Sequence, residues 1–435
     1  MAQSLDLPWG NQEKLTLDLP AGWEMAGRLT PASLPGVADP SAETRRGLSQ
    51  PIGTPRLSEL AHGKKRVALV IDDGSRPTPI HHLLPAVLFE LFTAGITPQQ
   101  IQLVPALGIH RAMEQLEVEQ RTGLVGLGNM RLVTHDCDDP GLVHLGKTSR
   151  GTPVSINGQV ATSDLIVSIG CIEPHIIAGF GGGYKNLFPG VAGRETIAHN
   201  HSLNCAPATF NMVGQPIENN PMRLDLEEAG QMLKPPVFIV NAVLNSAMQV
   251  VQVVCGHPIQ AHRAGTKISA SIYGVKVSAP ADVVITDSHP MDQDLRQGVK
   301  ALANTIRAVK RGGVLITLVR AEEGVGVFGL ANRKLPLGRG ALQTLSPLLL
   351  PLVPRLKLKG LGEEDKFFLY FALQAMRHAT LLMYAPTIPL EIHERLPFVQ
   401  FCATPQAALD QAARLVSGQA RVLAFPYGGS TYPIL

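Results

Sequence analysis

Short apolar segments alternate with segments of helical periodicity along most of this chain. Val67 to Ile71 is an apolar run that ends in two acidic residues, and a helix-length apolar segment follows from His81 to Ala94. Comparable runs, each bounded by Gly, Asn or Pro, begin at Ile101, Asp164, Val237 and Val250. Runs of this kind are typical of strands that are buried on both faces of a sheet. The pattern therefore predicts a buried, mostly parallel sheet.

A second series of the same kind begins near Pro280. We expect strands over 282–288 and 314–319, a helix over 293–310 between them, and further helix–strand pairs that end near 386 and 402. The fold class predicted is α/β, with two Rossmann-like domains whose sheets are mostly parallel.

The linker between these domains is expected around Pro280. The N-terminal α/β domain is predicted over residues 1–275 and the C-terminal α/β domain over 280–404. Residues 405–435, which contain the apolar run RVLAF, are expected to return to the first domain. The first sixty-five residues are rich in turns and are expected to supply edge strands and loops.

Composition narrows the class of protein without identifying it. Of the 435 residues, 45% are hydrophobic and 17% are charged, and the net charge of +3 is too small to indicate a nucleic-acid or membrane partner. The five cysteines are dispersed without a C-x-x-C pair, which is typical of reduced thiols in a cytoplasmic protein. The first residues have neither a basic nor an apolar stretch, so no signal peptide is expected, and no apolar run of the sequence reaches membrane-spanning length.

The segment from Pro174 to His201 is the richest in candidate chemistry. It combines His175, Lys185 and His201 with closely spaced glycines. Glycine allows close approach of the backbone to a ligand, lysine offers a charge or an amine for covalent attachment, and imidazole offers a metal ligand or a proton carrier. The segment thus predicts a site for a phosphate-bearing cofactor that carries a metal.

Two common nucleotide motifs do not fit this segment. A P-loop needs Gly directly before its Lys and Ser or Thr directly after it, whereas Tyr184 and Asn186 flank Lys185. A dinucleotide fingerprint started at Gly179 or at Gly181 places its third glycine on Tyr184 or Asn186.

A polar motif, Asp72 to Pro77, directly follows the first apolar strand. The carboxyl ends of parallel strands are where open α/β sheets bind ligands. There Asp73 can take a ribose or a positive group, Ser75 a phosphate, and Arg76 a carboxylate. The alternative is a capped turn before a helix, with Asp72 or Ser75 as the cap.

Two histidines follow other strands of the same predicted sheet. His110 comes after the strand that begins at Ile101, and His175 comes shortly after Cys171. Two such side chains can face one ligand from opposite sides, as racemisation at carbon requires. A structural role for each is the alternative.

His201 is a candidate nitrogen ligand for a late first-row metal, with His199 as an alternative or supporting group. Because there is no HExxH motif and no Cys/His cluster, most ligands of such a metal would come from an organic cofactor. In the second series, Arg296, Gln297 and Lys300 lie near a helix N-terminus, where they can bind a carboxylate or phosphate. A solvated helix face is the alternative.

These motifs occur in the order and spacing of a known family. DDGSRP, GIHR, EPH, GFGGGYKNLFPG and HNH, together with Gln297 and Lys300, closely resemble the nickel-pincer nucleotide-dependent lactate racemase family of 2-hydroxyacid racemases and epimerases. The resemblance covers most of the chain. It implies a two-domain enzyme with an interdomain active-site cleft. It also implies a cofactor, pyridinium-3,5-bisthiocarboxylic acid mononucleotide nickel, made by dedicated biosynthesis proteins.

Roles for single residues follow from the resemblance. It implies covalent attachment of the cofactor at Lys185, nickel coordination by His201, and paired acid–base catalysis by His110 and His175. The cofactor-binding residues would be Asp73, Gly74, Ser75, Arg76 and Lys185, and the substrate-binding residues would be Arg76, Arg296, Gln297 and Lys300. The implied reaction inverts C2 of a 2-hydroxy acid by hydride transfer through a 2-keto acid.

The chain departs from lactate-specific members at Arg296, where those members carry an aromatic residue. An arginine can pair with a second carboxylate or with a polyol, which favours malate-like or sugar-acid substrates, unless Arg296 is a surface residue. Two other functions compete with racemisation. One is a nicotinamide-type dehydrogenase, which the missing dinucleotide fingerprint disfavours, and the other is a non-catalytic protein that binds a nucleotide or metal.

Overall fold

The structure, a computed structural model, describes residues 3–10, 13–326, 328–356, 363–416 and 418–435. The chain forms two compact units. The motif unit comprises Ser33–Leu203 and Ile217–Ile272, and the terminal unit comprises Met1–Ala32, Asn204–Pro216 and Tyr273–Leu435. The glycine-rich segment belongs to the motif unit, whereas both chain ends belong to the terminal unit.

The motif unit is built around a six-stranded sheet in the order β13-β12-β9-β4-β5-β6. Its strands are β4 (Val67–Asp72), β5 (Ile101–Ala106), β6 (Arg131–Leu132), β9 (Leu165–Cys171), β12 (Val237–Leu244) and β13 (Val250–Gly256). All neighbours pair in parallel except β12 and β13, which are antiparallel. The predicted α/β class with mostly parallel sheets is confirmed.

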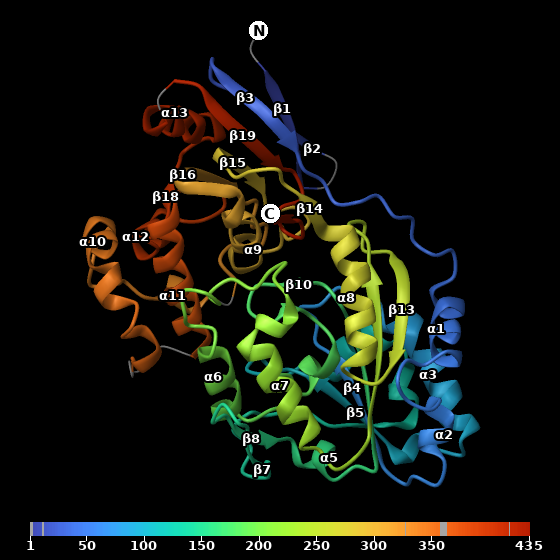
Figure 1. Cartoon of the computed structure of the whole chain (residues 1–435). Helices are drawn as coiled ribbons and strands as arrows, with labels where there is room; N and C mark the ends of the chain where they lie inside the picture. The colour runs from blue at the N-terminus through green and yellow to red at the C-terminus, as the bar shows by residue number, and fades with distance from the viewer. Residues whose placement is uncertain (1–2, 11–12, 327, 357–362, 417) are drawn as a thin grey trace. The chain divides into compact units, whose positions relative to one another are not determined.

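Helices cover the faces of this sheet, which explains the uninterrupted apolar strands. Every residue of β4 and β9 is buried. The helices are α1 (Pro40–Ser49), α2 (Leu57–Ala61), α3 (Ile80–Thr93), α4 (Gln115–Thr122), α5 (Gly158–Ala161), α6 (Arg194–Ser202), α7 (Pro221–Gln231) and α8 (Gln260–Tyr273). Helices α1 and α2 both contact α3, and α6 contacts α7 (Figure 1). Two hairpins, β7 (Val143–Lys147) with β8 (Pro153–Ile156) and β10 (Pro174–His175) with β11 (Gly179–Phe180), complete the unit.

The terminal unit has a fully parallel sheet in the order β18-β17-β16-β15-β19-β3. Its strands are β3 (Trp23–Arg28), β15 (Ala281–Asp287), β16 (Val309–Leu318), β17 (Thr380–Tyr384), β18 (Gln400–Phe401) and β19 (Ala420–Phe425). Its helices are α9 (Leu295–Thr305), α10 (Arg339–Leu349), α11 (Glu363–His378), α12 (Leu390–Arg395) and α13 (Pro405–Leu415). The hairpin of β1 (Ser4–Trp9) and β2 (Glu13–Asp18) buries Leu5, Leu7 and Leu17 in this core, and β14 (Gly274–Lys276) pairs with β20 (Tyr432–Ile434).

Three sequence-based expectations differ from this arrangement. Residues 405–435 belong to the terminal unit and not to the motif unit, because β19 pairs with β15 on one side and with β3 on the other. Residues 1–32 accordingly belong to the terminal unit rather than to the unit that carries the glycine-rich segment. The helix expected over 293–310 is shorter, because α9 ends at Thr305 and β16 begins at Val309.

Each sheet contains one point where the chain reverses its direction of travel across the strands. In the motif unit the chain runs from β4 through β5 to β6 and then returns to β9 on the other side of β4. In the terminal unit it runs from β15 through β16, β17 and β18 and then returns to β19 on the other side of β15. Ligands of open α/β sheets bind outside the carboxyl ends of the strands at such a point. The order of the strands therefore selects the ends of β4 and β9, and of β15 and β19.

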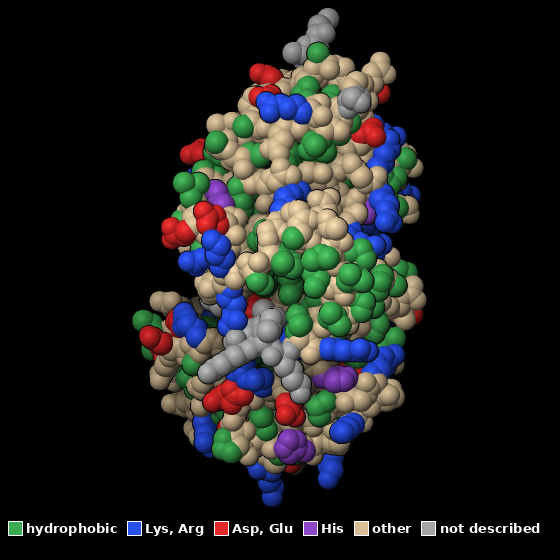
Figure 2. All heavy atoms as spheres, turned by 90° about the vertical axis from the view of Figure 1, so that its left-hand side faces the viewer, with side chains coloured by type: hydrophobic (Ala, Val, Ile, Leu, Met, Phe, Trp, Pro, Cys, Tyr) green, Lys and Arg blue, Asp and Glu red, His purple; other side chains and the backbone are tan. Residues whose placement is uncertain are grey.

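The surface carries charges of both signs. On the face drawn in Figure 2, basic and acidic side chains are interspersed, in keeping with the small net charge. Within the described residues, every helix is too short or too polar to cross a bilayer.

Candidate active site

The end of β4 carries the first group of candidate residues. Asp73 follows the strand and is 7% exposed. Its Oδ1 accepts hydrogen bonds from the hydroxyl and the backbone N–H of Ser75, at 2.6 and 3.2 Å. Its Oδ2 lies 2.5 Å from Nδ1 of His110, which follows β5. Neighbouring parallel strands thus place the predicted Asp73 and His110 in direct contact, in the manner of a carboxylate that orients a catalytic imidazole.

Asp73 is held in its ionised form. Burial alone would raise the pKa of this carboxyl group, but the hydrogen bond and charge of His110, the hydroxyl of Ser75 and the charge of Arg76 keep its pKa well below the usual range. Because Asp73 is anionic, Nδ1 of His110 is the donor in their contact. The Nε2 atom of His110 is then the ring nitrogen that can accept a proton from a ligand.

Arg76 connects β4 to β9. Its Nη1 donates to Oε1 of Glu173 at 2.7 Å, and both side chains are largely buried. The contact spans the reversal point between the two strands. Burial opposes the charge of Arg76, but Glu173 and Asp73 outweigh this and raise the pKa of the guanidinium. A fixed cation therefore lies at the carboxyl edge of the sheet.

Asp72 serves the fold rather than the ligand. Its carboxylate accepts from the hydroxyl of Thr78 and from the guanidinium of Arg121, and Nε of Arg121 also donates to the Asp72 carbonyl at 2.9 Å. These contacts tie the loop after β4 to α4. Neither Asp72 nor Ser75 caps α3, whose N-cap position is Pro79.

His175 lies in the short β10–β11 hairpin, opposite Gly179. Its Nδ1 accepts hydrogen bonds from the backbone N–H groups of Ile177 and Ala178, at 3.2 and 3.1 Å. An amide N–H can only donate, so Nδ1 of His175 bears no proton here. The neutral ring therefore carries its proton on Nε2, the opposite arrangement from His110.

Lys185 lies in the 3-10 turn Gly183–Asn186, directly after the glycines of 179–182. Burial and the positive charges of Arg76 and Arg223 lower the pKa of its amine to about 7, against the opposing effects of Glu173 and Asp73. A large fraction of the amine is consequently uncharged near neutral pH. An uncharged amine is the nucleophilic form that covalent attachment requires.

His201 lies on α6 and is 8% exposed. Its Nδ1 lies 2.7 Å from the carbonyl oxygen of Ile197, one turn earlier, so Nδ1 is the donor and Nε2 is the nitrogen suited to coordinate a metal. The helix is anchored by Asp225 of α7, a fully buried carboxylate that accepts from Thr148, Thr152 and Asn200. His199 is engaged in the same network through Thr152, at 2.8 Å.

The predicted substrate residues belong to the terminal unit. Arg296, Gln297 and Lys300 all lie on α9, which follows β15. Asp294 caps this helix by accepting from the backbone N–H of Gln297 at 2.7 Å. The three predicted substrate residues thus lie beside the reversal point of the second sheet, where the strand order independently predicts a ligand.

The structure brings several of these candidates together. Asp73, Ser75, Arg76 and His110 form one connected group at the ends of β4, β5 and β9, and Lys185 responds to its charges. Sequence analysis assigned no role to Glu173, although it lies in the motif EPH, and did not name Arg223. Glu173 could have been found by the rule that found His175, because both follow β9. Nothing in the sequence distinguishes Arg223 from a solvated helical arginine.

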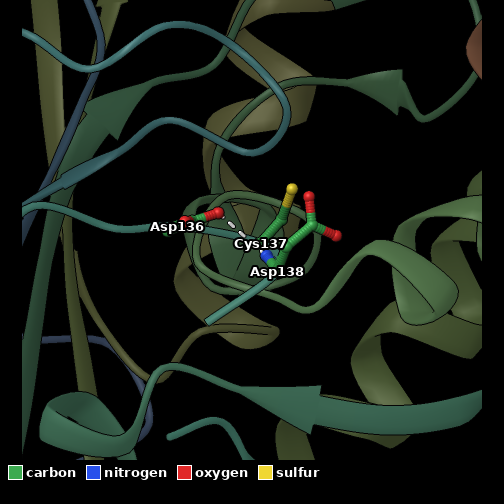
Figure 3. A group of neighbouring side chains, drawn as sticks. All are labelled: Asp136, Cys137 and Asp138. Carbon is green, nitrogen blue, oxygen red and sulfur yellow. Dashed lines mark hydrogen bonds between the residues drawn. The ribbon is translucent and has the colours of Figure 1, made fainter. Parts of the chain in front are cut away.

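Another group of potential metal ligands lies away from these candidates in the sequence. Oxygen and sulfur atoms of Asp136, Cys137 and Asp138 lie within 4.8 Å of one another, and Figure 3 shows the two carboxylates pointing in different directions. Asp138 is already paired with Arg194 through contacts of 2.7 and 2.5 Å. These contacts give the group a structural function at the start of α6.

Comparison with known proteins places the chain in a family. The model of the lactate racemase N-terminal domain matches residues 10–211. A lactate racemase of Thermoanaerobacterium thermosaccharolyticum is 32% identical over 331 residues, which cover 75% of this chain and 76% of that protein. A lactate racemase of Lactiplantibacillus plantarum is 31% identical over 288 residues, covering 65% of this chain and 67% of that protein.

The folds agree as well. The apoprotein structure of lactate racemase from Thermoanaerobacterium thermosaccharolyticum matches with a TM-score of 0.84 and 27% identity over the full length of both chains. A Thermotoga maritima protein of 16% identity shares the fold, with a TM-score of 0.65 over 91% of this chain and 99% of that one. The motifs, the fold and these similarities together show that the chain belongs to the lactate racemase family and is an isomerase.

Proposed function

We propose that this protein inverts the configuration at C2 of a 2-hydroxy acid with a nickel-pincer nucleotide attached to Lys185. The observation that supports this most directly is the group at the ends of β4, β5 and β9. It combines an oriented imidazole (His110), a fixed cation (Arg76) and an amine of lowered pKa (Lys185). Each has the chemical form that the proposed reaction requires.

The described residues fit such a cofactor. The glycine-rich turn presents a reactive amine, and the backbone at Gly74 is open, since a Cβ there would meet no atom within 4 Å. His201 has its Nδ1 engaged with Ile197, which leaves Nε2 as its coordinating atom. One protein nitrogen is too few for a metal site of its own, in keeping with a metal whose other ligands are organic.

The chain's own residues perform the proton chemistry and hold the substrate. When bound, the cofactor supplies a reversible hydride acceptor for the hydrogen on C2. Nε2 of His110 takes the proton of the substrate hydroxyl group, while Asp73 stabilises the resulting imidazolium through Nδ1. Arg76 attracts the carboxylate, and Nε2–H of His175 donates a hydrogen bond to the oxygen on C2.

The terminal unit supplies further substrate contacts in this proposal. Gln297 and Lys300 are three residues apart on α9 and thus share one face of the helix. Arg296 adds a second guanidinium near the start of the same helix. The relatives are lactate racemases, so lactate is the first substrate to test. Arg296 extends the test to hydroxy acids with a second carboxylate or a polyol chain.

The proposal is tested on holoprotein produced together with the cofactor biosynthesis proteins. We expect about one nickel per chain, a mass adduct confined to Lys185, and interconversion of enantiomers that chiral chromatography detects. Lys185→Ala should lose adduct and activity, whereas Lys267→Ala, at an exposed position on α8, should retain both. Full racemase activity without an adduct at Lys185 would contradict the proposal.

A further inference from the structure

Three glycines between Ala178 and Gly183 have a backbone conformation that only glycine adopts readily. Gly179, Gly182 and Gly183 have φ angles of 74°, 72° and 65°. A Cβ on Gly182 would lie 2.7 Å from both the Asn241 side chain and Ile172. Only Gly179 and Phe180 of this segment belong to a short strand, so its remaining polar groups need partners from elsewhere.

Arg223 of α7 supplies three of these partners. Its guanidinium is fully buried and donates to the carbonyl oxygens of Ala178, Phe180 and Gly182, the first at 3.3 Å and the last at 3.2 Å. The carbonyl of Gly182 also accepts from the backbone N–H of Lys185, at 3.2 Å. Arg223 is thus hydrogen-bonded to the oxygen on which the turn containing Lys185 begins.

Two further side chains secure the same backbone without carrying charge to it. Asn241 accepts from the N–H of Gly183 at 2.8 Å. The ring of His262 bonds the carbonyl of Gly181 at 2.9 Å, and burial lowers the pKa of this histidine well below its usual value. His262 is therefore neutral, whereas Arg223 contacts this segment as a cation.

Binding three carbonyl groups with a buried cation carries a large desolvation cost. Removing a guanidinium from water costs several kcal/mol unless charges and hydrogen bonds compensate. The charge of Arg223 is compensated only indirectly, because Glu227 on the same helix forms its ion pair with Arg263, at 2.7 and 2.8 Å. Burial lowers the pKa of Arg223 to about 10, yet the group stays charged at neutral pH. Its charge is thus available to act on a neighbour.

Lys185 is that neighbour. The charged groups that act on its amine are Arg76 and Arg223, which oppose protonation, and Glu173 and Asp73, which favour it. Arg76 is itself paired with Glu173 at 2.7 Å, so the two largely compensate each other. Arg223 has no carboxylate within ion-pair distance among the described residues, so its charge on Lys185 is less compensated.

We propose that Arg223 is a positioning residue that shapes the turn around Lys185 and keeps its amine reactive for attachment of the cofactor. This rests on the proposed role of Lys185 as the attachment point. Arg223 acts through two separable properties. Its three hydrogen bonds fix the backbone, and its charge favours the neutral, nucleophilic amine. This amine would condense with a thiocarboxylic acid group of the cofactor to give a thioamide with loss of water.

The test measures the amine in the apoprotein. Acetic anhydride acylates a neutral amine with release of acetate, so the rate at Lys185, followed by peptide mass spectrometry across pH, reports its protonation. We expect a midpoint near pH 7 in the native protein. In Arg223→Gln the midpoint should rise. Acylation of Lys185 at pH 7 should then slow by about 5-fold for the first whole pH step that the midpoint moves upward, and by about 10-fold for each further step. Exposed Lys267 is the internal reference and should not change.

A charge-retaining variant separates the two properties. Arg223→Lys should keep the low midpoint of Lys185 but lose most of the cofactor adduct, because one ammonium group cannot span three carbonyls. Glu227→Gln removes a negative charge near Arg223 and should lower the midpoint of Lys185, the opposite direction from Arg223→Gln. It also tests the proposal should Arg223→Gln fail to fold, as judged by circular dichroism.

An unchanged acylation profile in Arg223→Gln, or a raised midpoint in Glu227→Gln, would overturn this inference. A native holoprotein without an adduct at Lys185 would instead overturn the proposed function. The two failures are read from different samples and are therefore distinguishable.

Discussion

Two sides of the motif unit hold their functional groups by different means. On the carboxylate side, which consists of Asp72, Asp73, Arg76 and His110, charged side chains hold one another: Asp73 holds His110 and Glu173 holds Arg76. On the backbone side, which consists of His175, Lys185 and His201, hydrogen bonds with main-chain groups orient the side chains. Amides cap Nδ1 of His175, and a carbonyl accepts from Nδ1 of His201.

The difference makes the two candidate acid–base histidines unequal. His110 donates through Nδ1 to an anion, so a second proton on Nε2 gives a stabilised ion pair. His175 accepts through Nδ1, so a doubly protonated ring would have to give up two hydrogen bonds in the hairpin. The conformation described here therefore favours His110 as the proton acceptor and His175 as a hydrogen-bond donor through Nε2. Equal acid–base roles require the His175–Gly179 turn to rearrange.

The largest expected effect comes from removing the proton acceptor. His110→Gln should lower kcat for racemisation by about 10²- to 10⁴-fold in both directions, the range of general acid–base catalysis. His175→Gln keeps a donor and should lose only about 10-fold, the equivalent of one hydrogen bond. Chiral assays on holoprotein with matched nickel and adduct content provide the measurement. Equal losses in the two variants would refute the inequality.

A smaller effect is expected when only the support of His110 is changed. Asp73→Asn keeps the shape of the side chain but removes the charge that stabilises the imidazolium. We expect kcat to fall by about 10²-fold with little change in KM, since an interaction gained on protonation is lost. Ser75→Ala, which removes a hydroxyl from Oδ1 of the same carboxylate, serves as the matched variant and should fall by less. A larger loss in Ser75→Ala than in Asp73→Asn would contradict the proposed support of His110 by the charge of Asp73.

The sequence predicted candidate residues on both sides, but only on the carboxylate side did it also indicate which of them come together. Asp73 and His110 each follow an apolar strand, and parallel pairing necessarily brings the ends of such strands to one edge. The state of His175 depends on amides of Ile177 and Ala178 that only the folded hairpin directs at its ring. The role of Arg223 cannot be predicted from the sequence for the same reason, because its partners are backbone carbonyl oxygens, which every residue has.

Strand partners were also beyond reach of the sequence. An apolar run predicts that a strand exists but not what it pairs with, so the sequence did not indicate that β19 lies between β15 and β3. Its neighbour β3 lies near the other end of the chain, and no local signal links Trp23 to Ala420. The reversal points of the two sheets can be located only once the strand order is known.

On the backbone side, Lys185 is expected to reduce stability as the pH falls. Its pKa is lowered to about 7 in the folded protein, against about 10.4 in the unfolded chain. Between these values the unfolded chain binds more protons, so the free energy of unfolding decreases as the pH is lowered, and it levels off below about pH 7. Lys185→Met removes this penalty and should stabilise the apoprotein at pH 7 by about 1–3 kcal/mol.

Denaturant titrations at pH 7 and near pH 11 measure this difference, which should disappear at the higher pH. Lys267→Met, at an exposed position, should change stability by less than about 0.5 kcal/mol at either pH. A pH-independent gain in Lys185→Met would mean that packing, rather than the charge of the amine, is responsible.

The smallest expected effect concerns the ion pair at the start of α6. Arg194 and Asp138 form a two-point contact of 2.7 and 2.5 Å, but both side chains are 56% exposed. Exposed pairs contribute about 0.2–1 kcal/mol and are screened by salt. Arg194→Met should therefore lower stability by less than about 1 kcal/mol, and less still at high ionic strength. Nickel content should be unchanged, because His201 is oriented by the carbonyl of Ile197 within its own helix. A loss of nickel in Arg194→Met would show that a surface side chain also holds His201, which would break the distinction between the two sides.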